Sequence, residues 1–315
     1  MAASLDTFNA HRPRLFAIAY RMLGSRAAAE DVLQDAYVRW HQSDTYGAQP
    51  GEAQGLLVII YGRRRQLGDL DAGRNVFLAG ATGAIGKRLI PLLIDAGYAV
   101  AGTTRSEAKA AQLEAAGVRP IVLDIYDARA VLRALLDVAP EVVINQLTDL
   151  PQRLDPAHMG EALARNARIR TEGARNLVTA ARTAGVRRVI AQSVAWVYAP
   201  GRQPHVEDDA LDLNAEGTVR TTVHGVIELE RLTLDSAPLA GTVLRYGRLY
   251  GPGTGRDTPR GPPGLHVDAA AYAALLALER GETGTFNIAE DDAMLSNAKA
   301  YRELGWDPDF RLSAR

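Results

Sequence analysis

The stretch that most constrains the fold is residues 75–86, NVFLAGATGAIG. An apolar run leads into three glycines, Gly80, Gly83 and Gly86, and an apolar helical pattern begins at Lys87. This order predicts a strand, a tight glycine turn and a helix. Glycines let the backbone turn sharply and approach a pyrophosphate, whose charge then lies at the helix N-terminus. The stretch therefore predicts a dinucleotide-binding unit, and it begins only at residue 75.

Strand-like apolar runs recur after this turn and alternate with helical patterns. The expected strands are 76–79, 98–105, 119–124, 141–145 and 188–193, and the helical runs between them are 106–116, 127–138 and 162–184. Regular alternation of this kind predicts an α/β fold with a Rossmann-type, doubly wound parallel sheet. We expect two domains: a small all-α helical module over 1–73, and a nucleotide-binding domain over 74–315 with a short C-terminal substrate lobe from about 245.

Composition narrows the possible classes of function. The 315 residues carry a net charge of −1, so no global basic excess indicates nucleic-acid binding. The absence of cysteine excludes disulfides and thiolate metal sites, and no metal site is predicted. The N-terminus lacks the order of a signal peptide, and no apolar run is long enough to span a membrane. We expect a cytoplasmic protein without a membrane partner.

The first seventy residues show helical periodicity. Apolar residues recur at helical spacing over 8–23, 32–40 and 56–67, and Arg63, Arg64 and Arg65 lie near the end of the third pattern. Periodicity alone predicts a small helical bundle with a solvated, charged face.

The amino-acid sequence of this region carries a more specific signal than its periodicity does. FNAHRPRLFAIAYRMLGSRAAAEDVLQDAYVRWHQSD resembles region 2 of extracytoplasmic-function sigma factors. The resemblance implies docking on the clamp helices of the RNA polymerase core, and contacts with the phosphates of promoter DNA. It assigns docking to Glu30, Asp31, Gln34 and Asp35, and the phosphate contacts to Arg63, Arg64 and Arg65.

The resemblance to sigma factors is incomplete. Such factors also carry a second helical domain that reads the −35 element, and nothing after residue 75 resembles one. Two interpretations therefore stay open. The segment engages polymerase, or it is the remnant of a gene fusion and contributes only helical packing.

The rest of the chain, over about 75–315, resembles the extended short-chain dehydrogenase/reductases, which include sugar-nucleotide epimerases and dehydratases. GATGAIG, LDIYD, EGARNLVTAARTAGVRRVIAQSVAWVYAPG, LRYGRLYGPGTG and HVDAAAYA occur in family order. The resemblance implies a nicotinamide cofactor, with Asp124 and Ile125 flanking the adenine and Gln146 and Leu147 beside the ribose and nicotinamide. The residues it assigns to the phosphate loop are Gly80, Thr82, Gly83, Ala84, Ile85 and Gly86. Helices around 162–184 and 217–234 pair subunits in many relatives, so a homodimer is a possible assembly.

The residue at the end of the second strand bears on the choice of cofactor. Relatives that prefer NAD place an acid at this point to accept from the ribose 2′-hydroxyl. The present chain has Arg105 there, and a guanidinium suits a 2′-phosphate. We expect NADP rather than NAD; the alternative is a surface arginine at the strand end.

The catalytic residues of the family are only partly present. Ser193 matches the serine that holds the substrate oxygen, but the chain contains no Tyr-x-x-x-Lys proton-donor pair anywhere. Arg170 stands where the family usually has an asparagine. Two candidates for a substitute acid are His224 and Tyr246. The alternatives are an exposed helix residue for His224 and a packing aromatic for Tyr246.

Three functions follow from these patterns. The first is an NADP-dependent oxidoreductase or epimerase with a rearranged acid. The second is a non-catalytic NADP-binding sensor or scaffold, favoured by the missing pair. The third is a transcription-associated protein that engages polymerase through its sigma-like segment. The sequence predicts a small-molecule substrate but does not identify it.

Overall fold

The computed structural model describes residues 74–151, 156–281 and 283–312, together with the single residues Arg12, Phe16 and Glu30. The chain divides after Gly73 into two units, and the fold below is that of the second unit. Glu30 is helical and exposed. The expected all-α module, and with it the docking and phosphate-contact residues Asp31, Gln34, Asp35, Arg63, Arg64 and Arg65, lies outside the described residues.

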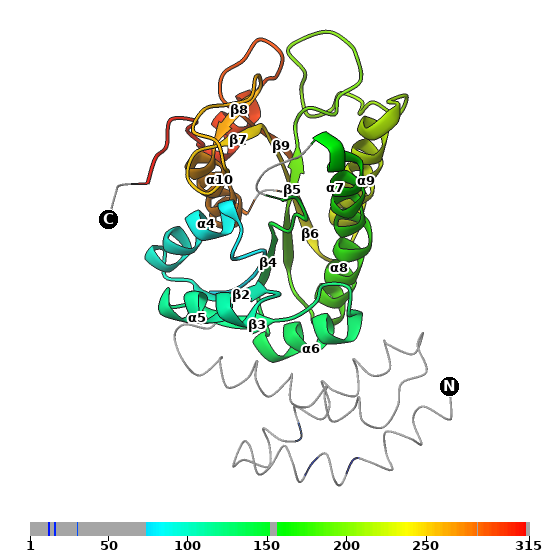
Figure 1. Cartoon of the computed structure of the whole chain (residues 1–315). Coiled ribbons are helices and arrows are strands. Elements are labelled where there is room, and N and C mark those ends of the chain that lie inside the picture. Colours follow the sequence, from blue (N-terminus) through cyan, green and yellow to red (C-terminus); the bar gives the residue numbers. More distant parts are fainter. Residues whose placement is uncertain are drawn as a thin grey trace. The chain divides into compact units, whose positions relative to one another are not determined.

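A parallel sheet forms the centre of the second unit (Figure 1). The order of its seven strands is β3-β2-β1-β4-β5-β6-β9. The strands are β1 (Asn75–Ala79), β2 (Ala99–Thr104), β3 (Arg119–Val122), β4 (Val142–Asn145), β5 (Arg188–Val194), β6 (Ala240–Tyr246) and β9 (Gly284–Ile288). The strand order reverses between β1 and β4, where Ala79 pairs with Asn145. This confirms the Rossmann-type sheet, and its ligand crevice is expected outside the carboxyl ends of β1 and β4.

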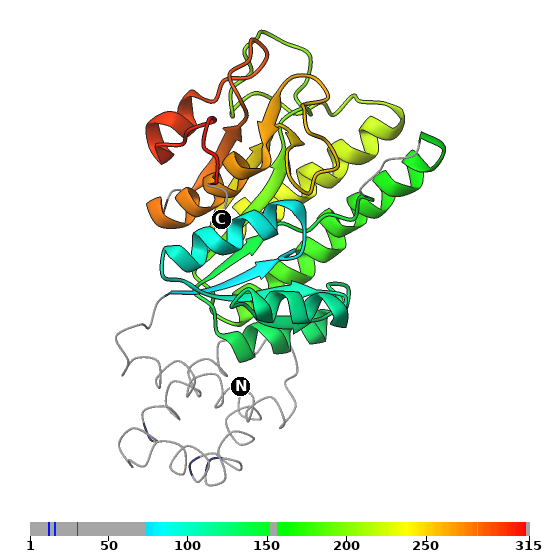
Figure 2. The same cartoon turned by 60° about the vertical axis from the view of Figure 1, so that its left-hand side comes forward.

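Helices cover both faces of the sheet, as the two views in Figures 1 and 2 show. On one face lie α4 (Ala84–Asp95), α5 (Glu107–Ala115) and α10 (Val267–Arg280). On the other lie α6 (Ala128–Val138), α7 (Met159–Arg168), α8 (Ala174–Thr183) and α9 (Gly217–Leu234). The doubly wound arrangement is therefore confirmed. Within the described ranges, no helix has the length and apolar character needed to cross a membrane.

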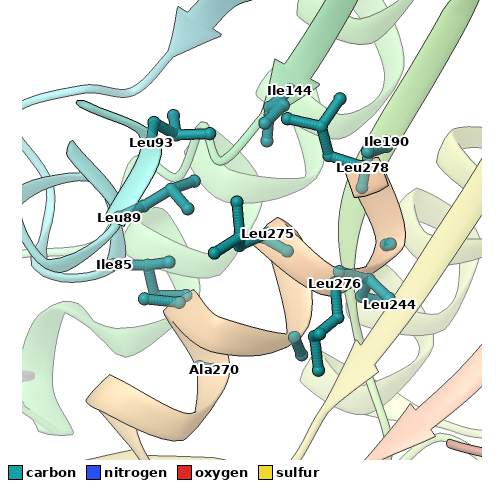
Figure 3. Close-up of a cluster of buried hydrophobic side chains, with 14 of the residues drawn as sticks. Ile85, Leu89, Leu93, Ile144, Ile190, Leu244, Ala270, Leu275, Leu276 and Leu278 are labelled. Atoms are coloured by element: carbon teal, nitrogen blue, oxygen red, sulfur yellow. The ribbon is translucent and has the colours of Figure 1, made fainter. Parts of the chain in front are cut away.

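The larger part of the core fixes the helix that follows the glycine turn. Leu89 and Leu93 of α4 pack with Leu275 and Leu278 of α10 against Ile144 of β4 (Figure 3). Full burial of each leucine contributes about 1.5–3 kcal/mol. The same two helices are joined by an ion pair between Arg88 and Asp268, so the start of α4 is held rigidly against the sheet.

Two parts of the second unit differ from the sequence expectations. The helix expected over 162–184 is interrupted by a π-helical turn, η2 (Ile169–Gly173), between α7 and α8. The Thr171 hydroxyl donates to the Ala167 carbonyl 3.1 Å away, an internal bond that periodicity does not reveal. The short elements β7 (Arg248–Tyr250), β8 (Gly264–His266), β9, η1 (Pro156–His158) and η3 (Ala300–Leu304) were not predicted, because three to five residues carry little periodic signal.

Candidate functional site

The glycine turn forms a cradle that side chains would fill. Gly80 has φ +87°, and a Cβ on it would lie 2.6 Å from the Gln146 carbonyl oxygen. A Cβ on Gly86 would overlap the Gly80 carbonyl oxygen. Both positions therefore require glycine. No side chain caps α4 at Gly83, so N–H groups of its first turn remain available to an anion.

Hydrogen bonds from neighbouring strands hold this cradle at the point where the strand order reverses. The Gly80 N–H donates to Thr103 Oγ1 at the end of β2, 3.1 Å away. The Gln146 N–H donates to the Ala79 carbonyl at 2.9 Å. The loop is thus fixed between β2 and β4, where a doubly wound sheet places a dinucleotide.

A buried polar pair lies at the carboxyl ends of β4 and β6. Gln146, 4% exposed, donates from Nε2 to the Tyr246 phenol oxygen at 3.3 Å. The phenol in turn donates to the Ala270 carbonyl at 3.1 Å, and burial raises the pKa of Tyr246 above its ordinary value. Gln146 Oε1 has no partner within the described part of the chain. Because a buried acceptor without a partner is costly, it fits a polar ligand beside the cradle.

Arg105 follows β2 at the same edge of the sheet. Its side chain is 65% exposed, and Nη2 lies 3.5 Å from Asp149 Oδ1 after β4. The guanidinium is therefore accessible to an anion, but it already pairs with the Asp149 carboxylate, which any such anion also approaches.

The residues after β3 form the next part of this edge. Ile125 is buried, and Asp124 is exposed while its Oδ1 accepts from the Tyr126 N–H at 3.0 Å. The Arg168 guanidinium lies 4.0 Å from the centroid of the Tyr126 ring. The segment offers an apolar surface beside polar groups. Leu147, after β4, is bonded through its N–H to Asn145 Oδ1 at 3.1 Å.

Ser193 belongs to a buried ionic network. It is fully buried, and its hydroxyl donates to Glu230 Oε1 of α9 at 2.7 Å. Glu230 also receives two bonds from Arg245 of β6, at 2.9 Å to Oε1 and 2.7 Å to Oε2. Burial alone would lower the pKa of Arg245, but the bonds to Glu230 raise it overall. The hydroxyl is therefore engaged on the α9 side of the sheet.

A second guanidinium lies near the same carboxylate. Arg170, in the π-helical turn, is 6% exposed, and burial lowers its pKa to about 10. The charge that favours its protonated form is Glu230. Within the described ranges Arg170 forms no side-chain hydrogen bond or ion pair. The sequence marked Arg170 as unusual but gave no sign of its burial.

The part of α9 that would carry a proton donor presents apolar residues inward. Val223 and Val226 are buried with Val194 and Val197 in one apolar cluster, whereas His224 is exposed on the helix. The structure therefore does not bring His224 together with Ser193 and Tyr246. Within the described residues, no group of three histidine, aspartate or glutamate side chains is placed to hold a metal ion.

Sequence reasoning did not single out two further residues at the carboxyl edge. Trp196 follows β5, and Arg248 begins β7 shortly after Tyr246. The Arg248 guanidinium lies 4.9 Å from the centroid of the Trp196 ring. The available signal was a tryptophan at a strand end, where parallel sheets bind their ligands.

The family is shown by comparison with known proteins. Residues 76–264 match the NAD dependent epimerase/dehydratase family, and the chain belongs to this family. Residues 7–60 match Sigma-70 region 2. A nicotinamide dinucleotide is consistent with this family and with the glycine cradle.

Individual relatives agree with these matches. A "3-diazoavenalumate denitrifying reductase" from a Streptomyces species is 43% identical over 241 residues, which span 69% of this chain and 76% of the relative. The ECF RNA polymerase sigma factor SigJ of Mycobacterium tuberculosis is 46% identical over 46 residues, 15% of this chain and 15% of SigJ. Among solved structures, the Thermus thermophilus UDP-glucose 4-epimerase complex with NAD superposes with a TM-score of 0.60 at 19% identity, covering 76% of this chain and 95% of that one. This last likeness concerns the fold.

Proposed function

We propose that the protein is an NADP-dependent reductase whose substrate accepts a hydride without receiving a proton from the protein. One observation carries this proposal: the dinucleotide cradle is complete, whereas the chain contains no Tyr-x-x-x-Lys pair. A positioned general acid contributes about 10²–10⁴-fold to a rate, so a carbonyl reductase without one is severely impaired.

An aromatic diazonium ion is the electrophile that best fits this site. Reduced nicotinamide, when bound, supplies a hydride. As the hydride forms the new C–H bond, the C–N bond breaks and dinitrogen leaves with its electron pair. The substrate carbon is reduced, the cofactor is oxidised by two electrons, and no proton is consumed. Carbonyl reduction, by contrast, requires a proton for the alkoxide oxygen.

Two further observations support this substrate class. The Streptomyces relative, at 43% identity, is named as a denitrifying reductase of a diazo compound. In this chain the inward positions of α9 near β5 are valines, Val223 and Val226. Apolar side chains there exclude water, and this protects an electrophile that water would otherwise attack.

The chain's own residues would then bind and orient rather than transfer protons. The uncapped first turn of α4 receives the pyrophosphate. Arg105 receives the 2′-phosphate that distinguishes NADP from NAD. Gln146 Oε1, which has no partner in the described part of the chain, accepts a hydrogen bond from the bound ligand.

A deuterium-transfer assay tests the proposal. The full-length protein is mixed with 4-carboxybenzenediazonium and NADPH that carries deuterium at both C4 positions, and nitrogen release and the arene product are measured. We expect protein-dependent NADPH oxidation, one dinitrogen per NADPH, and deuterium at the carbon that lost nitrogen. A Gly86→Val variant is the control, because its side chain fills the cradle.

Two results would contradict the proposal. Oxidation of NADPH at the rate without protein would leave a cofactor-binding sensor as the better interpretation. Deuterium-free product would show that the transferred hydride does not form the new C–H bond.

We propose a second activity for the N-terminal segment: binding to the RNA polymerase core and promoter DNA. The match of residues 7–60 to Sigma-70 region 2 and the short identity with SigJ favour it. The test is recovery of core polymerase by the full-length protein and by an Asp31→Arg/Asp35→Arg variant. Equal recovery by both would remove the proposed docking face. Such a partner implies a cytoplasmic protein.

A further inference from the structure

Trp196 and Arg248 lie beside the expected site of hydride transfer. The Ala195 N–H donates to the Tyr246 carbonyl at 2.9 Å, which places Trp196 next to the end of β6. Arg248 begins β7. Both residues therefore border the carboxyl edge of the sheet where Gln146 and Tyr246 meet, and neither has a role in the function proposed above.

The two side chains form one fixed, partly open surface. Trp196 is 38% exposed, more than is usual for tryptophan, which is on average highly buried. Arg248 is half-buried, and its Nε donates to the Pro262 carbonyl at 3.3 Å, which holds the guanidinium near the indole ring. The arrangement is a cation held over part of an exposed aromatic face.

The Arg248 charge has no acidic partner in the described ranges. No ion pair joins it to a carboxylate there, and its Nη1 and Nη2 atoms carry no hydrogen bond. Burial, followed by the nearby Arg260, lowers the pKa of Arg248. A half-buried guanidinium beside a second cation favours the approach of an anion.

We propose that Trp196 and Arg248 form a substrate subsite for a planar aryl group that carries a carboxylate. The aryl ring stacks on the indole, and the carboxylate pairs with the two free nitrogens of the guanidinium. This subsite rests on the proposed reductase function and specifies its substrate class. The diazo-bearing carbon then lies toward Tyr246 and Gln146, where the cradle directs the nicotinamide end of the cofactor.

The positive charge beside Trp196 favours a single carboxylate over a diphosphate. Arg248 is fixed there by a hydrogen bond, whereas Arg260 is exposed. One planar guanidinium matches one carboxylate with two parallel bonds. A sugar nucleotide would bring two phosphates and a non-planar sugar to the indole, so UDP is used as the competing probe.

Calorimetric titration of the NADP⁺-loaded, full-length protein tests the subsite without turnover. The probes are 4-hydroxycinnamate, its uncharged amide, the aliphatic carboxylate sorbate, and UDP. We expect saturable binding of 4-hydroxycinnamate, and binding of the other three weaker by about tenfold or more, because each lacks the aryl ring or the carboxylate.

Variants separate the contributions of Trp196 and Arg248 to the binding of 4-hydroxycinnamate. Trp196→Leu and Arg248→Met should each weaken 4-hydroxycinnamate binding about tenfold, while Trp196→Phe keeps it within about threefold because a ring remains. Arg187→Met is the matched control, since Arg187 is exposed just before β5, at the opposite edge of the sheet. NADP⁺ affinity, measured on each variant, reports whether the cradle is still folded.

The proposal is overturned if the amide or UDP binds as tightly as 4-hydroxycinnamate, or if no probe binds saturably. It is also overturned if Trp196→Leu and Arg248→Met bind like the control. If one variant does not fold, the probe series on the unmodified protein still decides the question. Binding without nitrogen release in the deuterium assay would refute the reductase and leave the subsite intact, so the two failures are distinguishable.

Discussion

The Ser193 hydroxyl donates a 2.7 Å hydrogen bond to Glu230 Oε1 inside the protein, on the side of the sheet covered by α9. Arg245 also donates two hydrogen bonds to the Glu230 carboxylate. The serine that the family pattern assigns to the substrate oxygen is therefore part of an ionic network that joins β5, β6 and α9. We therefore expect the main role of Ser193 in this chain to be structural.

Ser193→Ala should accordingly affect stability more than turnover. The substitution removes one bond from a buried carboxylate that keeps both bonds from Arg245, so we expect a loss of about 1 kcal/mol in the free energy of unfolding. Turnover of the diazonium probe should change by less than about threefold. Urea denaturation and steady-state rates measure the two effects. A fall in kcat of about 10²-fold or more at unchanged stability would instead place Ser193 at the reacting atoms.

Tyr246→Phe tests whether the phenol acts as an acid. The hydroxyl is buried, donates to the Ala270 carbonyl, and has a raised pKa. We expect a loss of about 1 kcal/mol in the free energy of unfolding, because the Ala270 carbonyl loses its donor. The pH–rate profile of reduction should keep its shape, since the phenol stays protonated throughout the working range. A titration that disappears with Tyr246→Phe would make Tyr246 a proton donor.

Local patterns account for the parts of the structure that were predicted. The glycine turn fixes the backbone by itself, because Gly80 and Gly86 leave no room for a side chain. The apolar runs located β1 to β5 within one or two residues in most cases. The strands of a parallel sheet are buried on both faces, so their consecutive residues are apolar. The helix over Gly217–Leu234 was expected from the family resemblance, and the structure contains it as α9.

The surroundings of the candidate catalytic residues could not be predicted in this way. Ser193 contacts Glu230, 37 positions later, and Arg248 contacts Trp196 across two strand ends. These pairings depend on the tertiary arrangement of α9 and β7, not on spacing. Arg170 shows the same limit: its sequence position is unusual, but its burial follows from the packing of the π-helical turn.

Arg105→Ala tests the choice of cofactor. The guanidinium lies at the end of β2, and a charge-assisted contact with a 2′-phosphate is worth about 1.5–3 kcal/mol. We expect NADPH binding to weaken between about tenfold and a hundredfold, with NADH binding unchanged. Asp149→Asn should act in the opposite direction, because it removes a negative charge 3.5 Å from the guanidinium. Calorimetry measures both, with Arg119→Ala, at the far end of β3, as the control. Equal losses for NADPH and NADH would contradict the assignment.

We expect Glu228 to make the packing of α8 on α9 dependent on pH. Hydrogen bonds from Arg231, and then from Arg175 of α8, lower the pKa of the Glu228 carboxyl to about 2, from an ordinary value of 4.5. The ionised form therefore stabilises the folded state fully above pH 4.5, and this contribution is lost as the pH falls toward 2. Glu228→Gln should cost about 1 kcal/mol at neutral pH, and this difference from the unmodified protein should shrink on acidification. Urea denaturation over a pH series measures it; a difference independent of pH would refute the role of charge.

Substitutions of Arg170 and of Glu230 should change the free energy of unfolding in opposite directions. Two buried guanidiniums, those of Arg170 and Arg245, lie near the single buried carboxylate of Glu230. Both short hydrogen bonds to this carboxylate come from Arg245. The Arg170 guanidinium is therefore desolvated without a hydrogen bond to Glu230, and only the charge of Glu230 favours its protonated form. This agrees with its lowered pKa. Arg170→Met keeps an unbranched apolar chain and removes the charge, so we expect the free energy of unfolding to rise by about 1–2 kcal/mol.

Glu230→Gln leaves both guanidiniums buried without a carboxylate, and it should lower the free energy of unfolding by about 3–5 kcal/mol. Urea denaturation at neutral pH, without cofactor, compares the two variants directly. If Arg170→Met were as destabilising as Glu230→Gln, the attraction between Arg170 and Glu230 would outweigh the desolvation of the guanidinium. A stabilised Arg170→Met protein, by contrast, would show that this chain keeps a buried cation at a cost to its stability, as proteins do where the charge serves the bound ligand.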